Sequence, residues 1–80
     1  MRDLRDSWTR MRFPNPLNVQ GYLAHLGERY HASIVTLQVE HTYDDGFTMV
    51  LLHHRQGLGT ELRAQAHPYG GETTDTYAGS

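Results

Sequence analysis

One stretch of alternating residues does most to limit what this chain can fold into. Between residues 33 and 43 the side chains alternate with a period of two, which is typical of a β-strand with two different faces. Asp44, Asp45 and Gly46 follow directly, and their composition favours a three-residue hairpin loop that ends on a glycine in the left-handed region. We therefore expect a second antiparallel strand after Gly46.

The loop length sets which residues of the two strands face each other. The expected pairs are Tyr43 with Phe47, His41 with Met49, Val39 with Leu51, and Leu37 with His53. One face of the hairpin then collects most of its large apolar side chains, and a helix should cover that face. The opposite face keeps a cluster of three aliphatic residues, Ile34, Val50 and Leu52.

A helix is expected just before this hairpin. Apolar residues recur there at the spacing of an amphipathic helix, and they are Val19, Tyr22, Leu23, Leu26 and Tyr30. Asn15 or Asn18 can cap the start of the helix, and Pro16 is tolerated in a first turn. This helix is the element that we expect to cover the hairpin.

The N-terminal segment also has a helical spacing. Leu4, Trp8 and Met11 recur at i, i+4 and i+7, which predicts a short helix over residues 2–12. Either this segment, through Trp8, or a second copy of the chain should cover the aliphatic cluster of the hairpin.

The C-terminal third has weaker patterns. Residues 60–66 alternate as a third antiparallel strand would, although their composition favours a helix, and the strand is the interpretation that we follow. From His67 onward no apolar periodicity is visible. The sequence thus predicts one α+β domain over residues 1–66, in which the amphipathic helix packs on a hairpin or a three-stranded meander, and a flexible polar tail over residues 67–80.

The size of the chain suggests that it needs help to stay folded. A domain of 80 residues buries a small core, and the absence of cysteine removes disulfides and cysteine-based zinc sites as sources of stability. Self-association is the leading candidate for another source of stability, so we expect a homodimer. Its candidate interface, which is equally the candidate surface for another protein, consists of Ile34, Val50, Leu52 and Trp8.

Charge and composition bear on partners and location. All seven basic residues are arginine, which is typical of a GC-rich bacterial or phage genome, and the net charge of −2 argues against a generally nucleic-acid-binding surface. A local basic patch remains as an alternative contact surface for nucleic acid, formed by Arg2, Arg5, Arg10 and Arg12. No apolar run reaches the length of a membrane span, so we expect a soluble, cytoplasmic protein without a membrane partner.

Six histidines raise the question of a metal or catalytic site. A catalytic arrangement would use His41 or His53 as base, Arg55 as anion stabiliser and Glu40 as acid. Glu40 and His41 are neighbours on one strand and therefore point to opposite faces, as do His53 and His54. We therefore predict no catalytic residues, no metal site and no cofactor.

The functional hypothesis that rests on the fewest assumptions is that the chain is a small non-enzymatic accessory or regulatory protein. It would bind a macromolecular partner, most simply another protein. Its size and codon bias suggest a phage or mobile-element inhibitor of a host protein. One alternative is a nucleic-acid-binding regulator that uses the arginine-rich N-terminus, and a second is a small nuclease-like enzyme.

Overall fold

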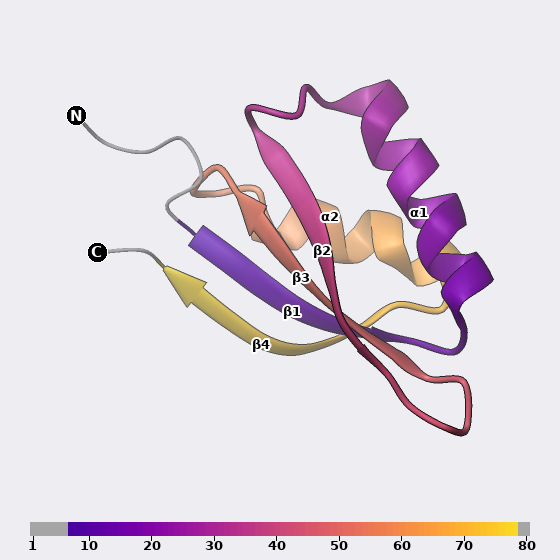
Figure 1. Cartoon of the computed structure of the whole chain (residues 1–80). Coiled ribbons are helices and arrows are strands. Elements are labelled where there is room, and N and C mark those ends of the chain that lie inside the picture. The colour runs from indigo at the N-terminus through magenta and orange to yellow at the C-terminus, as the bar shows by residue number, and fades with distance from the viewer. Residues whose placement is uncertain (1–6, 79–80) are drawn as a thin grey trace.

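Two helices cover one face of a four-stranded antiparallel sheet in the computed structural model, which describes residues 7–78 (Figure 1). The elements in chain order are β1 (Ser7–Phe13), α1 (Pro16–Arg29), β2 (Val35–Thr42), β3 (Thr48–His54), α2 (Gly59–Ala66), the 3-10 turn η1 (His67–Tyr69) and β4 (Glu72–Ala78). The strand order across the sheet is β2-β3-β1-β4. This connectivity and order are those of the split βαβ, or ferredoxin-like, arrangement. The predicted α+β class is confirmed.

The core lies between the sheet and the two helices. The central strands β1 and β3 bury every second side chain against the helices, while both helices bury one face. The apolar residues that lose almost all of their exposed surface are Met11, Phe13, Val19, Tyr22, Leu26, Val35, Val50, Leu52, Leu62 and Ala66. The sheet therefore has one face inside the core and one face without helices.

The hairpin loop has the predicted form. Gly46 lies in the left-handed region with φ of 95°, and its N–H donates to the Tyr43 carbonyl at 2.9 Å, while the Tyr43 N–H donates to the Phe47 carbonyl at 2.7 Å. His41 pairs with Met49 as expected. The loop and the first step of the register are thus confirmed.

Beyond His41 the predicted register is wrong, because β2 contains a β-bulge. The pairing shifts between Val39 and His41, so that Val39 lies opposite Val50 and Leu37 lies opposite Leu52. A shift of one residue exchanges the two faces of a strand. The helices consequently cover the face that carries Val50 and Leu52, and not the face that we expected.

The predicted N-terminal helix is also wrong for the residues that the structure describes; residues 2–6 of it lie outside them. Residues 7–13 form β1, in which Ser7, Thr9, Met11 and Phe13 point into the core and the residues between them point outward. The helical interpretation rested on three apolar residues. It overlooked that Met11 shares a period-two face with Thr9 and Phe13.

The amphipathic helix is present as predicted. The Asn15 side chain accepts a hydrogen bond from the Asn18 N–H at 3.0 Å, and Pro16 occupies the first turn. The Tyr22 hydroxyl donates to the Leu62 carbonyl at 2.8 Å inside the core. Burial raises the pKa of Tyr22 well above its usual value.

The C-terminal third differs from the prediction in two ways. Residues 59–66 form the helix α2, in line with their composition and not with their alternation. Residues 72–78 form β4, which pairs with β1, so the domain does not end at residue 66 and the expected flexible tail is wrong over residues 67–78. Residues 79 and 80 of that tail lie outside the described residues. The side chains of Glu72 to Tyr77 are exposed, which explains why no apolar periodicity marks this edge strand.

Candidate functional site

The face of the sheet that carries no helix is the most distinctive surface of the described chain (Figure 1). We call it the open sheet face. Its central side chains come from all four strands and are Trp8, Arg10, Arg12, Glu40, Met49, Leu51, His53, Asp75 and Tyr77. The alternation that buries Met11 and Val50 on one side presents these residues on the other.

An aromatic pair stands at one end of the open sheet face. Trp8 on β1 and Tyr77 on β4 are cross-strand partners, and their rings stack with centroids 3.8 Å apart and planes 26° apart. The Arg10 guanidinium lies 5.4 Å from the centroid of the Trp8 ring. Such cross-strand aromatic pairs stabilise a sheet, and here the pair also remains open to solvent, with Tyr77 42% exposed.

The two arginines of the open sheet face are held by carboxylates from the edge strands. Arg10 donates from Nε to Glu40 at 2.7 Å and from Nη1 to Asp75 at 3.2 Å. Its hydrogen bond to Glu40 is the main reason that the pKa of Arg10 lies above its usual range. Arg12 donates to Glu72 at 3.0 Å. Among the described residues, two arginines of this face thus pair with three carboxylates.

Apolar side chains complete the open sheet face toward the hairpin tip. Phe47, Met49 and Leu51 are all partly exposed, and the Arg12 guanidinium lies 4.7 Å from the centroid of the Phe47 ring. A shallow hollow of about 370 Å³ lies there, and Tyr43 forms part of its wall. Its other lining residues are Arg12, Asp45, Phe47, Met49 and Thr74, so the hollow has both apolar and polar walls.

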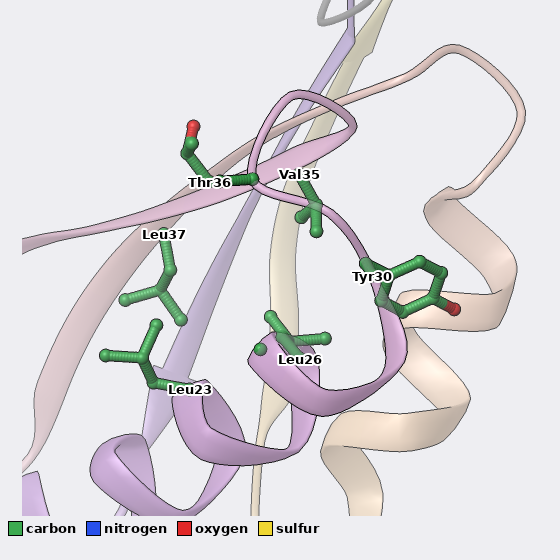
Figure 2. Close-up of a pocket in the computed structure, with 8 residues that line it drawn as sticks. Leu23, Leu26, Tyr30, Val35, Thr36 and Leu37 are labelled. Atoms are coloured by element: carbon green, nitrogen blue, oxygen red, sulfur yellow. The ribbon is translucent and has the colours of Figure 1, made fainter.

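A second surface feature is an apolar groove between α1 and the edge strand β2 (Figure 2). Its volume is about 320 Å³, and the residues that line it are Leu23, Leu26, Gly27, Tyr30, Ala32, Val35, Thr36 and Leu37. Leu23 from α1 and Leu37 from β2 point toward one another across it (Figure 2). None of the lining residues is charged.

The residues predicted to form one interface are not together in the structure. Val50 and Leu52 are fully buried in the core, at 0% exposure, so they are not presented to any partner. Ile34 is partly buried just before β2, and Trp8 lies on the open sheet face. The error follows from the bulge in β2, which placed Val50 and Leu52 under the helices.

The predicted nucleic-acid contacts are only partly described. Arg10 and Arg12 both lie on the open sheet face, whereas Arg2 and Arg5 lie outside the described residues. The sequence indicated that Arg10 could matter but gave no sign of its two carboxylate partners. Those partners depend on β4 and on the bulge, and neither was predicted.

The residues considered for catalysis do not converge. Glu40 is bound to Arg10, His41 lies edge-on against the Tyr43 ring, and His53 is the cross-strand partner of Trp8. Arg55 is exposed beyond the end of β3. Within residues 7–78 no group of three side chains is placed to hold a metal ion.

Sequence reasoning missed one buried polar pair. His54 is 1% exposed; its Nδ1 lies 2.9 Å from the Arg55 carbonyl and its Nε2 lies 2.9 Å from the Thr9 hydroxyl. The carbonyl can only accept, so Nδ1 donates, and in the tautomer protonated at Nδ1 alone the Nε2 atom accepts a hydrogen bond from the Thr9 hydroxyl. The pair resembles a nucleophile with its base, but Thr9 is 0% exposed and out of reach of a substrate.

Comparison with known proteins adds no family or relative. No family model, curated protein or solved structure matches the chain. The ferredoxin-like arrangement hosts many unrelated functions, so the function has to be argued from the surfaces themselves. In the described part of the chain, neither helix is long and apolar enough to cross a membrane.

Proposed function

We propose that this chain is a small non-enzymatic binding protein that holds a protein partner on its open sheet face. The observation that carries the proposal is the gathering of tryptophan, tyrosine, methionine and arginine on a sheet face without helices. Protein interfaces are enriched in these residue types, and their energetic centres most often contain tryptophan, tyrosine and arginine.

The charges of this face favour a protein over a nucleic acid. Nucleic-acid binding draws most of its affinity from arginines and lysines that replace counterions on phosphates. Arg10 and Arg12 already have carboxylate partners, and a phosphate would have to compete with Glu40, Asp75 and Glu72. A protein surface can pack on the aromatic and aliphatic groups without breaking these ion pairs.

An accessory or regulatory role fits a binding protein of this size. A single four-stranded sheet presents one broad face and can act by occupying a surface of its partner. Inhibition of a host protein by a phage or mobile-element product is one form that such a role takes, and it is the form that we propose.

The proposal is tested with a matched pair of charge substitutions. Leu51→Glu places a carboxylate in the middle of the open sheet face, and Leu17→Glu places one on α1 at a side chain that is 74% exposed. Affinity capture from the native host, followed by binding measurements on the purified partner, should show a loss of at least about tenfold for Leu51→Glu only, which corresponds to about 1.4 kcal/mol. Equal binding by both variants, with the fold intact, would contradict the proposal.

Single-stranded nucleic acid is the second candidate for the same face. It is favoured by the partly exposed stack of Trp8 and Tyr77, because sheet faces with aromatic side chains stack bases in several RNA-binding modules. Trp8 is the only tryptophan, so its fluorescence reports on this surface directly. Quenching by single-stranded oligonucleotides that weakens steeply between about 50 and 200 mM salt would favour this candidate over the protein partner.

A further inference from the structure

The two edges of the sheet differ in how they are protected. Natural edge strands avoid pairing with other chains through charges, prolines or bulges. The edge strand β4 carries Glu72 and Asp75, and its pairing with β1 is interrupted at Thr74. The edge strand β2 has an uninterrupted segment, residues 35–39, that contains neither a charge nor a proline. Of the two edge strands in the described residues, β2 therefore has the longer segment without such protection.

The hydrogen-bond pattern between β2 and β3 shows which backbone groups of β2 point away from the sheet. The Ile34 carbonyl accepts from the Arg55 N–H at 2.8 Å, so Ile34 faces β3. Backbone groups of an antiparallel strand alternate between its two sides. The N–H and carbonyl groups of Leu37 and Val39 and the carbonyl of Val35 therefore point away from β3, whereas the Val35 N–H donates to the His31 carbonyl at 3.3 Å. The side chains of these three residues lie on the helix side of β2.

Apolar surface accompanies these open backbone groups. Val39 is 52% exposed and Leu23 is 48% exposed. Leu37 lines the groove of Figure 2 together with Leu23, and it precedes Val39 by two residues on β2. A strand added to β2 would gain backbone hydrogen bonds and would cover these side chains in the same step.

We propose that the strand added to β2 belongs to a second copy of this chain. If a twofold axis passes through Leu37, residues 35–39 of the two copies can pair as antiparallel strands with matching side chains opposite each other. Leu37 meets Leu37 of the second copy, Val35 meets Val39 of the second copy, and Thr36 meets Gln38 of the second copy. Apolar side chains thus face apolar ones on the helix side, and polar side chains face polar ones on the other side.

The charges near the contact between the two β2 strands, which we call the seam, are compatible with this pairing. Glu40 is the first charged residue beyond the segment, and it would lie opposite Ile34 of the second copy and not opposite another carboxylate. Its own carboxylate is already bound to Arg10. Two four-stranded sheets would become one continuous sheet with both open faces on the same side. This inference is independent of what the open sheet face binds.

Two measurements on the intact chain test the proposal together. Light scattering gives the mass over a range of concentrations, and amide hydrogen exchange followed by NMR reports on the N–H groups of Leu37 and Val39. We expect a dimer in which these two amides are protected, and protection that falls on dilution. A monomer at millimolar concentration, or a dimer in which these amides exchange freely, would overturn the proposal.

A pair of lysine substitutions locates the seam. Val39→Lys should raise the dimer dissociation constant by at least about tenfold, because an ammonium group would be buried without a carboxylate, and the monomer should stay folded since the side chain is half exposed. Leu17→Lys, an equivalent change on α1, should leave the dimer intact. A dimer that survives Val39→Lys would place the seam elsewhere and refute the inference.

Discussion

Two neighbouring leucines on β3 offer a sharp check of which sheet face is buried. Leu52 is 0% exposed under the helices, whereas Leu51 is partly exposed on the open sheet face. Truncation of a buried leucine to alanine costs about 2–5 kcal/mol, because it removes buried methyl groups and leaves a cavity. We expect Leu52→Ala to cost this much and Leu51→Ala to cost about 1 kcal/mol or less.

The size of the domain sets the design of the assay. A chain of 80 residues has a free energy of unfolding of about 4–12 kcal/mol, at roughly 0.05–0.15 kcal/mol per residue. Leu52→Ala can therefore abolish folding, so Leu52→Val, which loses one buried methylene worth about 0.8 kcal/mol, is measured beside it. Leu51→Val is its matched control.

Urea unfolding followed by circular dichroism, at one fixed protein concentration, measures all four variants. With a slope of about 1 kcal/mol per molar urea, Leu52→Val should lower the midpoint by about 0.8 M and Leu51→Val should leave it almost unchanged. The reverse order, with Leu51 the more costly position, would mean that β2 has no bulge and that the helices cover the other face.

Three further predictions concern packing and ionisation. Because burial raises the pKa of Tyr22, its contribution to stability should be complete below pH 10 and should fall at higher pH by up to about 1.4 kcal/mol per pH unit. In urea unfolding, Tyr22→Phe should lower the free energy of unfolding by about 1 kcal/mol at pH 7, and the stability of this variant should decline less steeply at alkaline pH. An equally steep decline in both proteins would mean that ionisation of Tyr22 does not cause it. A Cβ at Gly71 would lie 2.8 Å from core side chains, so Gly71→Ala should lower the thermal midpoint through a loss of about 1–3 kcal/mol in stability. Gly27 has a helical backbone and open space around it, so Gly27→Ala should raise the midpoint, and similar effects at both positions would contradict the packing described. Tyr77→Ala should cost about 0.5–1.5 kcal/mol and shift the fluorescence of Trp8, and an unchanged spectrum would mean that the two rings do not stack.

The elements predicted from sequence are those that short-range interactions determine. The helix α1 has its cap at Asn15 and its own apolar stripe, and the hairpin loop has a glycine where a left-handed residue is required. These signals lie within a few residues of the structure that they specify. They could be recognised without knowledge of the rest of the chain.

The strands β1 and β4 escaped prediction because they depend on partners far away in sequence. β1 is a central strand with polar Ser7 and Thr9 on its buried side, so its apolar pattern is incomplete. Its neighbour β4 is an exposed, threonine-rich edge strand. Neither has a local signal that outweighs the helical spacing of Trp8 and Met11 or the polar character of the tail.

The candidate site was missed for a related reason. Trp8 was singled out, but its surroundings require β4, which supplies Tyr77 and Asp75. The face that remains open depends on the bulge in β2, where Glu40 turns toward Arg10. A bulge of one residue has no reliable local signature, yet it decides which side chains a partner can reach.

Site-specific photo-crosslinking in the native host tests most directly whether the open sheet face holds a protein. p-Benzoylphenylalanine replaces Leu51 in one variant and the exposed Leu17 of α1 in the other. We expect one protein to be crosslinked from position 51, with a yield that nuclease treatment does not change, and none from position 17. Crosslinks from position 51 to nucleic acid, or equal yields of the same protein from both positions, would contradict the proposed function.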